Sequence, residues 1–111
     1  MKVIALPEVQ QYLKKLKKIF FEKEYFGFED TAQKYVDELF NDIVTTLSIR
    51  PHRPAPKRFD KYGKNMKYAI FRAGKNKRTT WYAFFKTYQE HGETIYLVCY
   101  IANNHSVAQY L

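Results

Sequence analysis

The spacing of hydrophobic residues changes once along the chain, from a helical period to a strand period. Between residues 7 and 24, hydrophobic side chains such as Val9, Leu13 and Leu16 recur every three or four positions, with lysines on the opposite face. This pattern predicts an amphipathic helix, and a second stripe of the same kind predicts another over about 30–48. Because the connection between them is short, we expect an antiparallel helical hairpin.

The second half of the chain reads as strands. Runs rich in aromatic and β-branched residues predict strands over 67–72, 79–87 and 94–102, and residues 2–6 form a further β-prone run at the start. The final stretch, 103–111, is expected to form one short helical turn or an ordered tail. The order strand, helix, helix and three antiparallel strands predicts a single α+β domain, with the helical hairpin covering one face of the sheet.

Residues 50–56 join the two halves and contain three prolines, Pro51, Pro54 and Pro56. Proline removes a backbone donor and is excluded from the interior of helices and of sheets. The segment is therefore predicted to be an extended connector.

Charge is distributed unevenly. The chain of 111 residues has a formal net charge of +8, yet residues 1–49 hold seven lysines against eight acids and residues 79–111 hold one lysine against two acids. Residues 50–78 hold eleven Lys and Arg against Asp60 alone. Arginine pairs bidentately with phosphate and stacks on bases, so this basic segment is predicted to face a polyanion, most simply nucleic acid. The alternative is a solvated loop with no ligand.

Several classes of function are excluded by what the sequence lacks. The basic segment and the three later strands offer only Asp60, Glu90 and Glu93, which are too few and too scattered to hold the ions of a metal-dependent nuclease. No zinc-ligand spacing or phosphate-binding glycine motif is present. No cofactor is expected. Cys99 lies in an apolar run and is predicted to be a core residue. With one cysteine, no signal peptide and no long apolar run, the protein is expected to be cytoplasmic.

Phosphodiester chemistry without a metal remains possible, because RNA carries its own nucleophile, the 2′-hydroxyl. Arg, His and Tyr can position that group, transfer protons and stabilise charge. The candidate catalytic residues are Arg72, Arg78, His105 and Tyr110. Each has a plainer alternative: His105 could cap the last turn, and Tyr110 could anchor the tail. The candidate nucleic-acid-binding residues are Arg53, Arg58, Lys61, Lys67, Lys75 and Lys77.

The stretch 71–85 concentrates this charge at one turn. Alternation along the strand places Tyr68, Ile70 and Arg72 on one face. We expect Arg72 and Arg78 to lie side by side at the mouth of the turn, with Lys75 and Lys77 at its exposed tip.

The opening MKVIALPEVQQYL, the two-helix hairpin and the run KNMKYAIFRAG…TTWYAFF…ETIYLVCYIANNH resemble the RelE/ParE superfamily of bacterial toxins, also called plasmid stabilisation proteins. In that family a strand ending in Arg is followed by an aromatic and aliphatic strand and then by a hydrophobic strand leading to His or basic residues. The matching segments are 67–72, 80–86 and 95–105. The resemblance implies a four-stranded antiparallel sheet, including the first strand, behind a helical hairpin.

The resemblance also implies a cognate antitoxin as partner and one of two targets. Some members cleave mRNA on the ribosome, and others inhibit DNA gyrase. The cleaving branch carries two Lys where Tyr68 and Ile70 stand here, and an Arg near Thr80 or Trp81. His105 or Ser106 stands at the late basic position. The sequence leaves open a cleaving toxin, a non-enzymatic inhibitor of gyrase, and a basic nucleic-acid-binding domain without toxic function.

Overall fold

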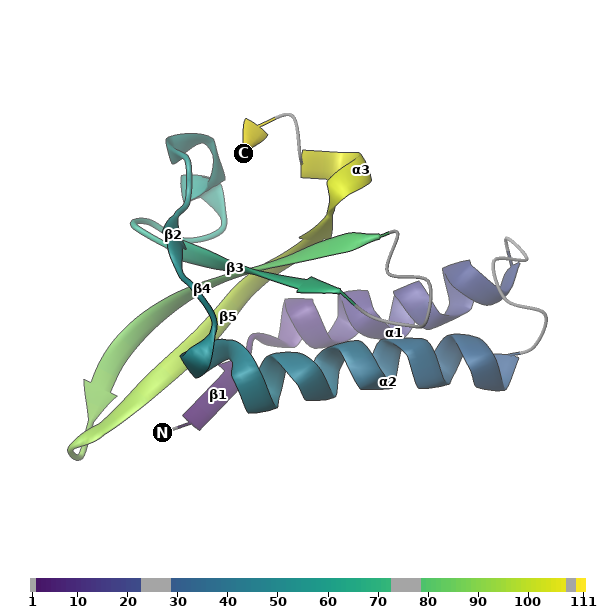
Figure 1. Ribbon diagram of the computed structural model, residues 1–111, viewed down its shortest axis with the longest axis horizontal. Coiled ribbons are helices and arrows are strands. Elements are labelled where there is room, and N and C mark those ends of the chain that lie inside the picture. The colour runs from purple at the N-terminus through teal and green to yellow at the C-terminus, as the bar shows by residue number, and fades with distance from the viewer. Residues whose placement is uncertain (1, 23–28, 73–78, 108–109) are drawn as a thin grey trace.

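The computed structural model describes the backbone of residues 2–22, 29–72, 79–107 and 110–111 (Figure 1), and their side chains except at 19–22, 29–32 and 105–106. Two long helices and a sheet form an α+β fold. The strands are β1 (Lys2–Ala5), β2 (Arg53–Pro54), β3 (Lys67–Arg72), β4 (Thr80–Glu90) and β5 (Glu93–Asn103). The helices are α1 (Pro7–Glu22), α2 (Glu29–Thr46) and α3 (Asn104–Val107), with 3₁₀ turns η1 (Leu47–Ile49) and η2 (Lys57–Lys61).

Most elements predicted from residue spacing are confirmed. Helix α1 begins at Pro7 as expected, and α2 ends two residues early, where η1 continues the chain. Strand β3 matches its prediction at both ends, while β4 and β5 extend further toward their shared turn. That turn contains only His91 and Gly92, both with positive φ (52° and 78°), which is the backbone that a tight two-residue hairpin requires.

The helical hairpin covers one face of the sheet (Figure 1). Leu13 of α1 and Leu39 and Ile43 of α2 are buried against the sheet residues Phe71 and Trp81, so the predicted hydrophobic stripes form the main core. Each fully buried aliphatic side chain contributes about 1.5–3 kcal/mol. This core fixes the sheet and leaves its opposite face free for other segments.

The layout of the strands differs from the predicted four-stranded antiparallel sheet. The sheet has five strands in the order β1-β5-β4-β3-β2, and β1 runs parallel to β5, with Lys2 opposite Ile95. The prediction was wrong on this point because it overlooked the geometry of the hairpin. Helix α1 leads onward from β1, and α2 returns the chain to the side of the sheet where β1 begins (Figure 1). Strands β3 and β5 therefore run in the direction of β1.

The fifth strand comes from the proline-rich connector. Arg53 and Pro54 form β2, which pairs antiparallel with Tyr68 and Lys67 at the edge of the sheet. The connector is extended, as predicted, and a proline is tolerated here because an edge strand has one side without a partner.

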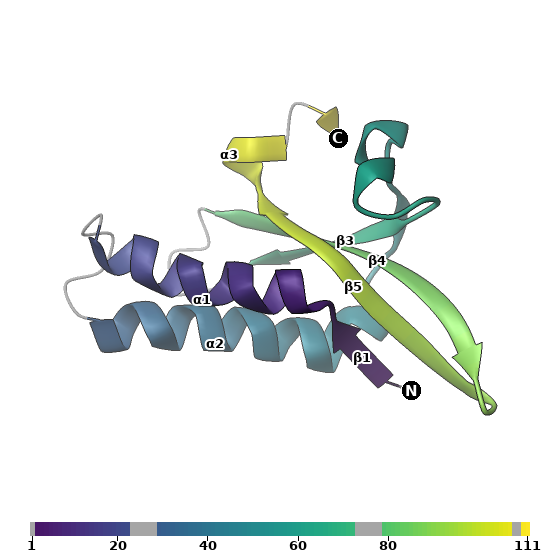
Figure 2. The same ribbon diagram turned by 180° about the vertical axis from the view of Figure 1, so that it is seen from behind.

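We call the sheet face opposite the helices the distal face. Figure 2 shows the molecule from behind, with α1 and α2 on one side of the sheet and α3 on the other. Its side chains form a second hydrophobic cluster, covered in part by η2 and α3. Phe59 of η2 stacks on Phe84 with ring centroids 4.6 Å apart. The strand residues of this face are Tyr68, Ile70, Tyr82, Phe84, Leu97, Tyr100 and Ala102.

Cys99 is buried in this cluster, as predicted. It is the extra residue of a β-bulge, because Phe84 lies opposite Tyr100 while Phe85 lies opposite Val98. Burial raises the pKa of its thiol, which keeps it neutral and unreactive. Among the described residues, no helix has the length and apolar character to cross a bilayer.

Candidate nucleic-acid interface

The first part of the basic segment is structural and does not face a ligand. Arg50 donates to Asp42 Oδ2 (2.7 Å), to Thr46 Oγ1 (2.8 Å) and to the Ile70 carbonyl (3.2 Å). Its guanidinium carbon also lies 4.3 Å from the centre of the Phe71 ring. Arg50 therefore ties the end of α2 to β3 and neutralises a carboxylate. Its charge is thus paired within the fold.

His52 also has an internal role. Its Nε2 lies 2.7 Å from the carbonyl oxygen of Leu47, and its ring packs edge-on against Phe85 with centroids 4.7 Å apart. The imidazole therefore bridges η1 and the helix-facing side of β4. The charge available for a ligand begins after this point, at Arg53.

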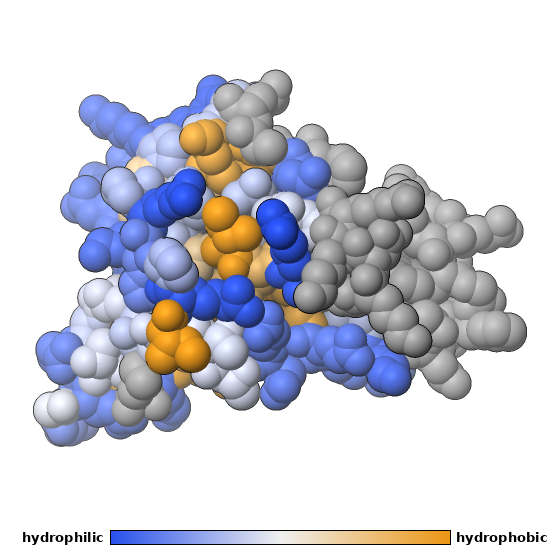
Figure 3. Space-filling model, viewed as in Figure 1, coloured by the Kyte–Doolittle hydropathy of each residue, from blue (hydrophilic) through white to orange (hydrophobic). Residues whose placement is uncertain are grey.

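Three cations after this point, Arg53, Arg58 and Lys61, lie over the distal face. Arg53 is exposed, and because it pairs directly with Tyr68 it projects from the same face as that residue. Arg58 and Lys61 are exposed on η2, whose Phe59 is anchored in the distal cluster. In Figure 3, seen from the same side as Figure 1, small apolar patches lie between strongly hydrophilic residues.

Aromatic rings lie among these cations. Tyr62 stacks on Tyr100 with ring centroids 3.8 Å apart and planes within 3°, and Lys61 Nζ lies 5.2 Å from the centre of the Tyr62 ring. Tyr82 is half-buried next to Tyr68. Partly exposed rings beside Lys and Arg are the arrangement that binds single-stranded nucleic acid, in which bases stack and phosphates pair with cations.

The environment of Tyr100 limits its chemistry. Burial raises its pKa to about 12, and a hydrogen bond and repulsion from Tyr62 add to this effect. A tyrosine that holds its proton so firmly cannot serve as a general base near neutral pH. Tyr100 is suited to stacking and to hydrogen bonding as a neutral hydroxyl.

The predicted catalytic residues are not gathered at one described site. Arg72 ends β3 and is exposed, opposite Thr80, whose backbone N–H donates to Asn104 Oδ1 of α3 (3.1 Å). Arg72 and α3 thus share one end of the sheet. The ring centre of Tyr110 instead lies 3.4 Å from the guanidinium carbon of Arg58. The structure therefore brings a predicted catalytic residue, Tyr110, next to a predicted nucleic-acid-binding residue, Arg58.

Part of the prediction falls outside what the structure describes. Arg78, Lys75 and Lys77 lie in residues 73–78, and only the backbone of His105 is described, within α3. The predicted side-by-side placement of Arg72 and Arg78 therefore lies outside the described residues. Among the side chains that are described, no group of three His, Cys, Asp or Glu could hold a metal ion.

Lys67, a predicted nucleic-acid-binding residue, lies on the sheet face opposite Tyr68. Its direct partners are Pro54 and Phe85, and Phe85 belongs to the helix-facing core, so Lys67 projects away from Tyr68. It lines a depression of about 220 Å³ at the edge of the sheet. The other lining residues are Lys64, Asn65, Phe85, Lys86 and Thr87.

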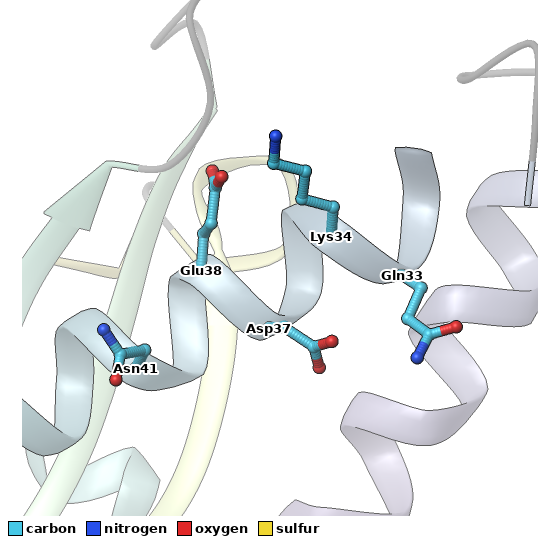
Figure 4. A pocket seen from close by; sticks show the side chains of 5 residues that line it. All are labelled: Gln33, Lys34, Asp37, Glu38 and Asn41. Atoms are coloured by element: carbon cyan, nitrogen blue, oxygen red, sulfur yellow. The ribbon is translucent and has the colours of Figure 1, made fainter. Parts of the chain in front are cut away.

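A larger depression, about 510 Å³, lies on the outside of α2 (Figure 4). All its lining residues come from that one helix, and the labelled side chains of Asp37 and Glu38 point in different directions. Asp37 pairs with Lys17 of α1, at 2.8 Å. These are features of an ordinary solvated helix surface, and we place the candidate interface on the distal face.

Sequence reasoning missed two residues of this region. The apolar run around Tyr100 predicts only a hydrophobic central strand, although alternation with Ala102 places Tyr100 on the distal face. Lys86 adds little to the charge balance, although a lysine within an otherwise apolar and aromatic strand is itself a signal. Its stem packs close to Gly63, where an added Cβ would lie 2.9 Å from Lys86 Cε.

Three residues named in the sequence comparison with the cleaving toxins are packed side chains. Trp81 is fully buried in the helix-facing core, Tyr68 is buried in the distal cluster, and Ile70 is half-buried beside it. Comparison of the chain with protein-family models, curated proteins and solved structures finds no match.

Proposed function

We propose that this protein is the toxin of a type II toxin–antitoxin pair, and that it acts through the distal face on RNA engaged in translation. The proposal rests on the sequence resemblance to RelE/ParE toxins. The observation that carries the choice of RNA is the set of exposed cations and half-buried tyrosines over one sheet face.

The chemistry of that face fits a single strand better than a duplex. Stacking on an aromatic side chain contributes about 1–3 kcal/mol per base and does not depend on sequence. Tyr62 and Tyr82 offer partly exposed rings, while Arg53, Arg58 and Lys61 lie close enough to the same face to contact the phosphates of a bound strand. RNA in loops and unpaired stretches can splay its bases onto such a surface, whereas stacked duplex bases cannot.

Growth inhibition without RNA cleavage is the second candidate function, and inhibition of DNA gyrase is its concrete form. The observation that favours it is the burial of Tyr68 and Trp81. The resemblance places catalytic cations of the cleaving toxins at Tyr68 and at either Thr80 or Trp81.

A partner follows from the same proposal. The cognate antitoxin is expected to be acidic and to dock on the helical hairpin or on the sheet edge so that it blocks the cations. Attraction to the basic segment makes its association fast and salt-sensitive.

The first experiment measures binding of unstructured single-stranded RNA over a range of salt concentrations. Replacing Arg53, Arg58 and Lys61 together with Gln removes three cations. The slope of log affinity against log salt concentration falls in magnitude by about 0.7 for each phosphate contact that is lost, so this slope should fall by about 2. The matched control replaces Lys2, Lys14 and Lys15, three exposed lysines outside the distal face, and keeps the full slope. Equal slopes in the two triple variants would exclude the distal face as the contact surface.

The second experiment identifies the target in cells. Induction in bacteria is followed by measurement of protein synthesis, mRNA 5′ ends and DNA double-strand breaks. New 5′ ends with arrested synthesis indicate mRNA cleavage, whereas double-strand breaks indicate gyrase. Unchanged growth with RNA binding intact would leave a nucleic-acid-binding domain without toxic function. Arg72→Ala should relieve growth inhibition while the protein stays folded.

A further inference from the structure

The depression lined by Lys67 lies at a discontinuity in the sheet. Strand β3 begins at Lys67, opposite Phe85, while β4 continues to Glu90. Beyond Phe85, therefore, the edge of β4 is not paired with β3, and the turn at Lys64 and Asn65 passes beside it. We call the hollow between that turn and β4 the notch. Its lining residues are Lys64, Asn65, Lys67, Phe85, Lys86 and Thr87.

Three of the six lining residues are lysines, and none is acidic. The other polar lining groups, the Asn65 amide and the Thr87 hydroxyl, can both donate hydrogen bonds. Phe85 is almost completely buried and supplies an apolar wall. The lysine charges in this hollow repel one another, and a bound anion would offset that repulsion by attracting each lysine.

The backbone around the notch places these lysines along its rim. Asn65 adopts φ of 57°, a left-handed conformation that Asn tolerates better than most residues, and it reverses the chain between Lys64 and Lys67. Gly63 leaves room for the stem of Lys86, because a Cβ there would lie 2.9 Å from Lys86 Cε and 3.0 Å from Met66 Sδ. The stem of Lys86 thus lies against the turn that carries Lys64.

The size of the notch limits what can bind. A volume of about 220 Å³ is below the range of about 300–1,000 Å³ found for sites that enclose a drug-sized ligand. The hollow suits a small group with concentrated negative charge. Lysine binds phosphate as a point charge and does not require the planar geometry that arginine and carboxylate share.

We propose that the notch is a binding site for a phosphate group, held by Lys64, Lys67 and Lys86. It is distinct from the end of the sheet that carries Arg72. Lys86 is six residues along β4 from Thr80, the partner of Arg72, which corresponds to about 20 Å of strand. The bound group is either a phosphate of a nucleic acid strand that crosses the distal face or a free phosphate ion. The first source rests on the proposed function and the second does not.

The primary test is a titration of isotope-labelled protein with inorganic phosphate at constant ionic strength, followed by backbone amide resonances. Saturable shifts are expected at Asn65, Lys86 and Thr87, with chloride producing none. Lys86→Gln should weaken phosphate binding about tenfold, the effect of losing one charge-assisted hydrogen bond. Lys57→Gln is the matched control, since Lys57 is exposed in the same basic segment but does not line the notch. Shifts that do not saturate, or equal weakening by both substitutions, would overturn the proposal.

Gly63→Ala supplies a second perturbation that keeps every charge. The added methyl group displaces the Lys86 stem, so phosphate binding should weaken while the melting temperature changes little, because the contacted atoms belong to flexible side chains. Phosphate binding that is unchanged by Gly63→Ala and by Lys86→Gln would show that Lys86 does not hold the anion.

A titration with single-stranded RNA separates the two sources. If the notch takes a phosphate of the strand, Lys86→Gln should reduce the salt slope by about 0.7. If inorganic phosphate binds while the RNA slope is unchanged in that variant, the site serves free phosphate. In either case the phosphate site stands or fails separately from growth inhibition, which is measured in cells.

Discussion

Arg50 and Arg53 differ by three positions in the sequence and carry the same charge, yet the structure gives them opposite roles. Arg50 lies in a network with Asp42, Thr46 and the Ile70 carbonyl, whereas Arg53 projects from the exposed edge strand. Replacing each with Ala should therefore affect different properties. Arg50→Ala should destabilise the fold and leave RNA binding intact, and Arg53→Ala should do the reverse.

The magnitude for Arg50→Ala follows from its contacts. The Arg50 and Asp42 side chains are each 31% exposed, so their pair lies between an exposed ion pair, at about 0.2–1 kcal/mol, and a buried one, at about 3–5 kcal/mol. We take about 2 kcal/mol for the pair, and the stacking over Phe71 adds about 0.5 kcal/mol. A loss of about 2.5 kcal/mol should lower the melting temperature by about 10 °C in a domain of this size.

The assay is urea and thermal unfolding of both variants, followed by circular dichroism. Arg53→Ala should stay within about 0.5 kcal/mol of the parent protein, as exposed substitutions do. A double-mutant cycle with Asp42→Ala isolates the Arg50–Asp42 pair and should give a coupling energy of about 2 kcal/mol. The reasoning is refuted if Arg50→Ala is as mild as Arg53→Ala, or if Arg50→Ala reduces the salt slope of RNA binding.

Two further predictions concern the distal cluster. The pKa of Tyr100 is raised to about 12 in the folded protein, so the free energy of unfolding should be constant below the ordinary tyrosine pKa of 10.0 and fall by about 1 kcal/mol between pH 10 and 12, allowing for partial exposure. Unfolding of Tyr100→Phe should show a smaller fall over this pH range, and its tyrosinate absorbance should show one fewer tyrosine that ionises at high pH. Phe59 is 4% exposed and anchors η2, so Phe59→Ala should lower the free energy of unfolding by about 3 kcal/mol, whereas Phe59→Leu should recover much of that loss. Equal stability of the two variants would show that η2 is not held by this ring.

The elements that the sequence predicted well are those fixed by local spacing. Helical periodicity around Leu13 and Leu39 and alternation along 67–72 record which side of each segment is buried, and burial decides the local structure. The hairpin turn at Gly92 is local in the same sense. None of these features depends on which distant segment lies next to them.

The features that were missed depend on distant partners. The direction of β1 follows from the return path through two helices, and β2 exists only because the start of β3 lies beside residues 53–54. Charge alone could not separate Arg50 from Arg53. Asp42, Thr46 and Arg50 are nevertheless spaced four residues apart, which places them on one side of a helix and its extension, and this spacing was a usable signal.

The parallel pairing of β1 with β5 has a consequence for the order in which the protein folds. The first strand of the sheet pairs with the last, so the contact between Lys2 and Ile95 closes a loop of about 90 residues, a separation that slows folding. The helical hairpin and the β4–β5 hairpin contain only local contacts and can form early. During synthesis β1 must wait for β5 to be made, and until then the backbone edge of β1 that later pairs with β5 is open to other chains. A chaperone or an early-binding partner would find that edge only on the nascent protein.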